Sequence, residues 1–440
     1  MSFPRYETYR DSGVEWLGEV PSHWDIKPLK AVASFNDDAL GEGTPADNEI
    51  EYVDISGVDA IRGIVQIDTM PFAQAPSRAR RRAIDGDVLI STVRTYLRAI
   101  APVSQPPHNL VVSTGFAVIR PRTANTHFLG YAVRSETFIA HVISRSTGVS
   151  YPAINASELV CIKFPVPPAE DQLTIADFLD SETAKIDALV DEQRRLIELL
   201  NEKRQAVISN AVTKGLDPSV PMKPSGIEWL GDIPAHWSVS RIATLYCEVA
   251  EPGNDDLPVL SVSIHDGVSD DELSPEQMDR KVSRSEDRSK YKAVRPNDLV
   301  YNMMRAWQGG FGTVKVEGAV SPAYVVARPK DKLETEFVEW IMRTPQCVEE
   351  LRCRSIGVAD FRLRLYWDEF KDVRLALPPL DEQRRILTGV AQEIARYDAL
   401  CTEAHSAITL LQERRAALIS AAVTGKIDVR AAKATERKVA

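Results

Sequence analysis

An internal repeat constrains this chain more than any other feature of its sequence. Residues 13–24 recur as residues 226–237, with 8 of 12 identical at an offset of 213, and we call this segment the opening motif. A second match pairs 164–217 with 375–428 at an offset of 211, without a gap. Between these anchors the offset drifts to 208 and 209. The ends of both copies are therefore expected to share a structural role, while the middles become different surfaces.

A long helix is predicted at the end of each copy, over 169–213 and 380–424. Both segments are rich in Ala, Leu, Glu, Gln and Arg, lack internal proline, and follow Pro-Pro with acidic residues in the first turn. Apolar seams with heptad spacing run along both helices. The first seam contains Ile186, Gln193, Leu200, Val207, Val190, Ile197 and Ala211, and the second contains Tyr397, Ala404, Leu411, Leu418, Cys401, Ile408 and Ala422. We expect the helices to pair in antiparallel fashion as a spacer.

The middles of the copies read as mixed strand and loop. Short apolar runs predict strands at 88–90, 116–119, 299–301 and 324–327, and one short helix is expected near 127–143 and again near 336–352. The expected fold class is α+β, with two globular mixed α/β domains separated by two long antiparallel coiled-coil helices in a pseudo-two-fold repeat. The expected boundaries are 1–168 for the first domain, 169–213 and 380–424 for the helices, 214–379 for a linker and the second domain, and 425–440 for a flexible basic tail.

Composition excludes several classes of protein. The 440 residues contain no apolar run near the ~18 that a membrane span needs, and the first residues lack the apolar stretch of a secretory signal. A cytoplasmic protein without a membrane partner is expected. The five cysteines are scattered and form no Cys-x-x-Cys pair, so they are expected to be reduced and mostly buried thiols.

Motifs of catalysis are absent from the sequence. There is no phosphate-binding loop, no glycine-rich cofactor loop after a strand, and no Asp/Asn-Pro-Pro-Tyr/Phe motif of amino-methyltransferases. The seven histidines have no metal-ligand spacing, and His23 and His236 are predicted to pack beside Trp24 and Trp237. No catalytic residue, bound cofactor or metal site is therefore expected in this chain.

Positive charge is concentrated in the middles, although the net charge of the chain is -10. From Ile61 to Arg145 there are eleven arginines against four acids, and from Met278 to Arg328 ten basic residues against five acids. Duplex DNA requires local positive charge on the protein. Each copy is therefore predicted to carry one basic DNA-binding patch.

Comparison of the copies indicates candidate DNA contacts. Arg94 and Tyr96 align with Arg305 and Trp307, and Arg145 precedes Gly148 as Arg354 precedes Gly357. Arginine can bind guanine with two hydrogen bonds or contact phosphate. The alternative is that Arg94 and Arg305 form buried structural ion pairs. The full candidate set is Arg80, Arg81, Arg82, Arg94, Tyr96, Arg98, Arg145, Thr147, Ser150, Tyr151, Lys290, Lys292, Asn302, Arg305, Trp307, Gln308, Arg354, Arg362 and Arg364.

The whole pattern resembles the DNA-specificity subunit of type I restriction-modification systems. The resemblance is carried by Glu-Trp-Leu-Gly-x-x-Pro-x-His-Trp, a divergent module, and Pro-Pro-x-x-x-Gln before a long helix, all present twice. It implies two target-recognition domains, each reading half of an asymmetric bipartite DNA site. It also implies that the helices set the spacer and bind two methyltransferase subunits, which restriction subunits join. S-adenosylmethionine, ATP and Mg²⁺ would then belong to those partners.

Two other functions remain open on the sequence. One is a specificity subunit of a fused restriction-methylation enzyme of another type. The other is a coiled-coil scaffold for proteins, in which the basic windows would be incidental.

Overall fold

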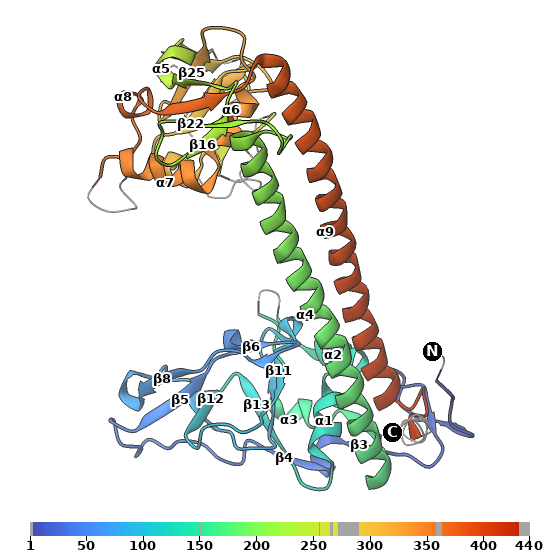
Figure 1. Cartoon of the computed structure of the whole chain (residues 1–440). Helices are drawn as coiled ribbons and strands as arrows, with labels where there is room; N and C mark the ends of the chain where they lie inside the picture. Colours follow the sequence, from blue (N-terminus) through green and yellow to red (C-terminus); the bar gives the residue numbers. More distant parts are fainter. Residues whose placement is uncertain are drawn as a thin grey trace. The chain divides into compact units, whose positions relative to one another are not determined.

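The computed structural model describes residues 3–148, 151–254, 256–264, 267–271, 290–357 and 363–430. The chain forms two compact units. Unit 1 contains Met1–Gln193 and His405–Ala440, and unit 2 contains Arg194–Ala404. Each unit therefore includes part of both long helices, α4 (green in Figure 1) and α9 (red).

The two long helices are present where the sequence predicts them. Helix α4 spans Ala169–Lys214 and α9 spans Leu380–Val423. In unit 1, Arg415 Nε lies 2.9 Å from Asp187 Oδ1, and in unit 2, Arg204 Nε lies 3.7 Å from Asp398 Oδ1. The helices are antiparallel in each unit, and every residue of the predicted seams is buried or half-buried. No helix in the described ranges is both long and apolar enough to cross a membrane.

The globular part of unit 1 contains two four-stranded sheets. Their orders are β11-β10-β13-β4 and β8-β5-β12-β9, and β5 and β12 are parallel. The strands are β1 (Tyr9–Asp11), β2 (Glu19–Pro21), β3 (Asp25–Pro28), β4 (Ala33–Phe35), β5 (Glu49–Val53), β6 (Val58–Asp59), β7 (Gly63–Ile64), β8 (Asp68–Pro71), β9 (Ala79–Arg82), β10 (Val88–Ser91), β11 (Ile100–Pro102), β12 (Leu110–Ser113), β13 (Phe116–Pro121) and β14 (Lys163–Val166). Its short helices are α1 (Thr126–Val133), α2 (Glu136–Arg145) and α3 (Ala156–Leu159).

Unit 2 repeats the first of these sheets in the order β18-β25-β22-β23. Its strands are β15 (Met222–Pro224), β16 (Asp232–Pro234), β17 (Ser238–Arg241), β18 (Tyr246–Val249), β19 (Val262–Ser263), β20 (Gly267–Val268), β21 (Lys292–Val294), β22 (Leu299–Asn302), β23 (Phe311–Thr313), β24 (Gly318–Val320), β25 (Tyr324–Pro329) and β26 (Arg374–Leu377). Its short helices are α5 (Ile242–Leu245), α6 (Thr335–Met342), α7 (Pro345–Arg354) and α8 (Trp367–Phe370). The mixed α/β class and the duplication are thus confirmed.

The single short helix expected in each middle is wrong, because each unit has two helices there. Ser135 interrupts the first and accepts a hydrogen bond from Phe138 N–H, while Thr344 accepts one from Cys347 N–H. A hydroxyl that caps the next helix ends the preceding one. Helices α1 and α6 pack against the first sheet of their unit, and their Phe128 and Phe337 are buried in the same cores as the strands β10 and β22.

The opening motif is fixed to the first turn of the long helix in each unit. Trp24 and Trp237 are fully buried. The predicted packing is confirmed for His23, whose ring lies 5.6 Å from that of Tyr6 and 6.4 Å from that of Trp24 between ring centres, and both histidines also contact acids, which the sequence did not indicate. His23 Nε2 lies 3.0 Å from Asp171 Oδ2, and His236 Nε2 lies 2.6 Å from Glu382 Oε2.

The glutamine of Pro-Pro-x-x-x-Gln joins the same helix to the preceding module. Gln172 donates to Pro167 O (2.8 Å) and accepts from Asn125 N–H (2.8 Å), the cap of α1. Gln383 likewise donates to Pro378 O (2.9 Å) and accepts from Glu334 N–H (3.1 Å), the residue before α6. The buried amide satisfies backbone groups that the helix ends leave free.

Two smaller expectations are also corrected. Residues 425–430 are not a flexible tail, because Val429 is fully buried in the core of unit 1 and Asp428 N–H donates to Pro4 O. Residues 431–440 lie outside the described part. Of the five cysteines only Cys347 is fully buried, and Cys161 and Cys353 are exposed.

The acid at the start of the long helix is Asp171 in unit 1 and Glu382, longer by one methylene, in unit 2. This difference gives a prediction. Glu382 Oε1 also accepts from Trp237 Nε1 (3.2 Å), whereas the shorter Asp171 leaves Trp24 Nε1 without a partner among the described residues. We expect Asp171→Glu to raise the free energy of unfolding by about 1 kcal/mol and Glu382→Asp to lower it by about 1–3 kcal/mol. Urea denaturation followed by tryptophan fluorescence measures both. Destabilisation by Asp171→Glu would contradict the prediction.

Candidate nucleic-acid interface

Three segments of unit 1 meet at one end of its first sheet. They are 92–98, 145–148 and 151–154. The N–H of Arg94 donates to Pro152 O (2.8 Å), the N–H of Ile154 donates to Thr92 O (2.9 Å), and Thr147 pairs with Ala153. A 3-10 turn, η4 (Thr95–Leu97), projects from this assembly, which we call the loop cluster of unit 1.

Unit 2 builds the same arrangement from the corresponding residues. Its segments are 303–309, 354–357 and 363–365. The N–H of Leu365 donates to Met303 O (2.9 Å), and Ile356 pairs with Arg364. The 3-10 turn η6 (Ala306–Gln308) occupies the place of η4. The structure therefore brings both predicted arginine pairs into one cluster per unit, which sequence spacing alone could not establish.

Most candidates in the loop cluster of unit 1 are exposed. Arg94, Tyr96, Arg98, Arg145, Thr147 and Tyr151 are all exposed. The Arg94 guanidinium lies 4.6 Å from the centre of the Tyr151 ring, and Arg98 Nη1 lies 2.5 Å from Glu136 Oε1. The alternative of a buried ion pair is wrong for Arg94. Ser150 lies outside the described residues.

The candidates of unit 2 are more varied in their surroundings. Gln308, Arg364 and Lys290 are exposed, whereas Asn302, Arg305, Trp307 and Arg354 are half-buried. No ion pair of Arg305 occurs among the described residues, so the alternative of a buried pair is not supported there either. Trp307 Nε1 donates to Met304 O (3.0 Å), and Asn302 Oδ1 accepts from Met304 N–H (3.0 Å). Arg362 lies outside the described residues.

The three consecutive arginines of unit 1 lie on strand β9 of the other sheet and not in the loop cluster. Arg80 stacks over Phe72 (4.7 Å), and Arg82 Nη1 lies 3.5 Å from Asp38 Oδ2. Arg81 is half-buried, burial lowers its pKa, and its Nη1 has no partner within the described ranges. The matching residue Lys292 donates its Nζ to Tyr324 O (2.7 Å). The three arginines form a second candidate group in unit 1, and Lys292 occupies the matching position in unit 2.

Internal ion pairs reduce the positive charge that the windows offer to DNA. Arg78 pairs with Asp54 at 2.5 Å, and Arg295 pairs with Glu251 at 2.9 Å. Arg82 and Arg98 are paired as well. The simple count of charges along the sequence therefore overstates the free positive charge. Arg94 and Arg145, for which the described part of the chain offers no ion pair, gain importance in unit 1.

One matched arginine in each window is structural. Arg120 binds Asp87 through two hydrogen bonds of 2.8 Å, and Arg328 binds Asp298 through two of 2.9 Å. Both aspartates are fully buried. The hydrogen bonds that Arg328 donates to Asp298 raise the pKa of Arg328. This pair holds β13 or β25 to the turn before β10 or β22, and so supports the strand from which each loop cluster begins.

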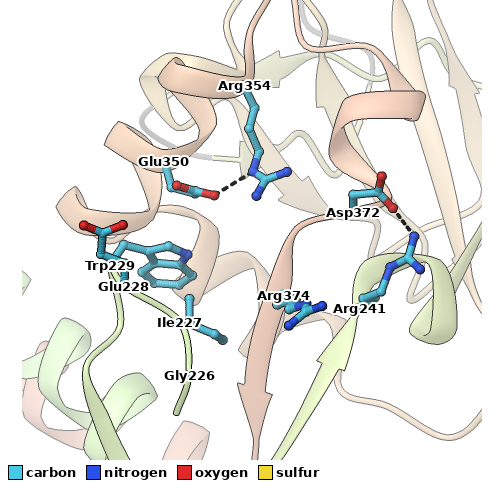
Figure 2. A pocket seen from close by; sticks show the side chains of 9 residues that line it. All are labelled: Gly226, Ile227, Glu228, Trp229, Arg241, Glu350, Arg354, Asp372 and Arg374. Atoms are coloured by element: carbon cyan, nitrogen blue, oxygen red, sulfur yellow. Dashed lines mark hydrogen bonds and ion pairs between the residues drawn. The ribbon is translucent and has the colours of Figure 1, made fainter. Parts of the chain in front are cut away.

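A polar pocket of about 670 Å³ lies beside helix α7 in unit 2 (Figure 2). Arg354 lines it with its Nε 2.6 Å from Glu350 Oε1, and Trp229 of the opening motif forms another wall. Arg241 pairs with Asp372 in the same pocket. Glu350 of the same helix therefore binds the Arg354 guanidinium, which makes Arg354 less available for a contact with DNA.

Sequence comparison missed two features of these clusters. Leu97, next to Tyr96, is 47% exposed, and Met304 is 45% exposed. The alignment of Leu97 with the candidate Gln308 could have indicated the first.

No group of histidine, cysteine and acidic residues suited to a metal ion occurs within the described ranges.

Two mixed α/β units with matching loop clusters, each joined to long helices, define a duplicated recognition protein. Residues 83–199 match the type I restriction modification DNA specificity domain. The EcoKI specificity subunit of Escherichia coli is 20% identical over 93% of this chain and 90% of its own. The HsdS subunit from Thermoanaerobacter tengcongensis is 22% identical with a TM-score of 0.51, covering 93% of this chain and 98% of that one. A chain from a type I R-M system gives a TM-score of 0.62 at 22% identity over 92% and 98%. These matches confirm the resemblance to type I specificity subunits.

The buried arginine-aspartate pair gives a prediction. Asp298→Ala removes two hydrogen bonds of the half-buried Arg328 and leaves it with Glu251, whose Oε1 lies 2.6 Å from its Nη1, so we expect the free energy of unfolding to fall by about 1–3 kcal/mol. Asp331→Ala, at an exposed position in the same unit, should change stability by less than about 0.5 kcal/mol. Equal urea midpoints for the two variants would show that the pair does not support the sheet.

Proposed function

We propose that this chain is the DNA-recognition subunit of a type I restriction-modification complex. Unit 1 reads one half of an asymmetric bipartite site and unit 2 reads the other. The observation that carries the proposal is the pair of loop clusters. They share the hydrogen bond that joins the third segment to the first and the pairing of the second segment with the third, but they present Tyr96 and Leu97 in one unit and Trp307 and Gln308 in the other. Two copies of one scaffold with different side chains suit two different half-sites.

The long helices are the proposed binding surface for the methyltransferase subunits. After each unit has buried its seam, large apolar side chains remain exposed on the same helices. They are Leu173, Leu189, Leu196, Leu199, Leu400 and Leu410. Repeated exposed leucines on a paired helix favour a helical partner. Restriction subunits would join through these partners.

Catalysis is assigned to the partners. The relatives of this chain are named specificity subunits, and the chain itself is a recognition subunit without catalytic activity. In this proposal S-adenosylmethionine binds the methyltransferase subunits, and ATP and Mg²⁺ bind the restriction subunits. Reading DNA within such a complex also places the protein in the cytoplasm. A second candidate is the specificity subunit of a fused restriction-methylation enzyme. The genes beside this one would show whether the partner is fused or consists of separate subunits.

The first test concerns the matched arginines. Arg94→Ala and Arg305→Ala should each weaken binding of the assembled complex to its cognate duplex by about tenfold or more, because a base or phosphate contact is lost. Arg122→Ala is the control, since this exposed arginine follows the opposite end of β13. Electrophoretic mobility shifts at fixed salt measure all three. Unchanged affinity with intact assembly would make both arginines structural.

The second test concerns the helices as a ruler. Seven residues inserted into both helices, between Asp187 and Arg204 in α4 and between Asp398 and Arg415 in α9, keep both ion pairs and add about 10 Å. The preferred spacer should grow by about three base pairs, since one duplex turn is about 34 Å. Selection of methylated sites from a random-spacer library reads the result. The same insertion between Lys214 and Met222 is the control, and an unchanged spacer in the helix variant would contradict the proposal.

A further inference from the structure

The turn η4 of unit 1 has an unusual backbone. Arg94 and Arg98, which flank it, have φ of 50° and 56°, in the left-handed region that residues with a side chain seldom adopt. In unit 2 the position of Arg98 is held by Gly309 at φ 84°, and Arg305 has φ -132°. Glycine takes this conformation at no steric cost. Unit 1 therefore has two arginines in a strained backbone conformation, whereas the matching turn of unit 2 is not strained.

Both arginines fasten the turn to the body of unit 1. Arg94 stacks on Tyr151, and Arg98 forms its ion pair with Glu136, the first residue of α2. The hydrogen bond between Thr95 Oγ1 and Ser146 Oγ (2.8 Å) adds a third connection. Strain of this kind persists where the surrounding structure fixes it and is concentrated at functional sites. The turn is thus held in one shape before any partner binds.

This rigid turn presents two adjacent apolar side chains. Tyr96 is 49% exposed and Leu97 is 47% exposed, and Tyr151 beside them is 63% exposed. In unit 2 the Trp307 indole is instead hydrogen-bonded to its own turn, and a polar Gln308 stands at the place of Leu97. The apolar tip is therefore a property of the turn in unit 1 and not of the shared scaffold.

The surroundings of the tip favour DNA over an apolar protein groove. Arg94 and Arg145, which are exposed and form no ion pair with any described residue, lie in the same loop cluster, so a partner must be anionic around its edge and apolar where the tip enters. A duplex offers this combination, because phosphates flank the stacked faces of the bases. Apolar side chains of DNA-binding proteins enter base steps and unstack them.

We propose that Tyr96 and Leu97 form a wedge that enters the duplex at one base step of the half-site read by unit 1. Arg94 and Arg98 position the wedge, and unit 2 reads its half-site without one. This inference rests on the proposed function and adds a deformation of the DNA that unit 1 alone produces. Base identity at the unstacked step then contributes to specificity through the ease of unstacking.

The test uses the free-energy cost of unstacking a base step. A duplex that lacks a base at the step where the wedge enters does not have to meet this cost. Single abasic positions are scanned through both half-sites, and binding by the chain assembled with its methyltransferase is measured. One position in the half-site of unit 1 should bind about tenfold tighter than the intact duplex. Positions where the methyltransferase extrudes a base form a separate class. The variant Tyr96→Ala/Leu97→Gln should lose the gain at the wedge position and keep it at those others.

Two further variants make the test specific. Arg122→Ala, at an exposed position outside the loop cluster of unit 1, should leave the abasic profile unchanged. Arg98→Gly should keep the fold, because glycine suits the left-handed position, yet it should reduce the gain by releasing the turn from Glu136. Thermal unfolding verifies the fold of each variant.

Each other outcome overturns the wedge. Sequence-specific binding with no gain that depends on Tyr96 and Leu97 would refute it and leave the proposed function standing. Failure of the double variant to assemble with the methyltransferase would identify the tip as a protein contact instead. Absence of specific binding by the wild-type complex would refute the proposed function and the wedge together.

Discussion

The attachment of the opening motif and the module to the start of each long helix supports the rest of the structure. In both units an acid of the first turn of the long helix contacts the histidine of the opening motif. The tryptophan that follows this histidine and the glutamine that follows this acid are both buried. That glutamine reaches the backbone where the first short helix of the module begins. The helix direction is thereby set by the module that precedes it, and the recognition loops lie on that same module.

The duplication separates what is shared from what differs. The shared part consists of backbone pairing and buried groups, including the Arg120–Asp87 and Arg328–Asp298 pairs under the first sheet. The part that differs lies in the exposed side chains of the 3-10 turns. Because the backbone of the cluster is fixed by its own hydrogen bonds, side chains there can change without loss of the fold. This arrangement explains how one scaffold serves two different half-sites in the proposed function.

The sequence predicted the large elements well, because long helices and buried strands leave periodic patterns of apolar residues. It missed the break at Ser135, since a single hydroxyl that caps a helix hardly alters that pattern. It also overestimated the free positive charge, because Arg82 and Arg98 meet acids that are distant in the sequence. The strained backbone of Arg94 and Arg98 could not be predicted from the sequence, because arginine seldom has a positive φ and the contacts that fix it there are tertiary. The predicted DNA contacts themselves stay predictions.

The central claim is that one chain with two copies of a fold reads two different halves of one DNA site. Sequencing of methylated adenines in a host that carries this chain with its methyltransferase tests that claim most directly. The account predicts a single asymmetric motif of two unlike halves separated by a spacer of constant length. A symmetric motif, or two halves that occur at variable spacing, would contradict it.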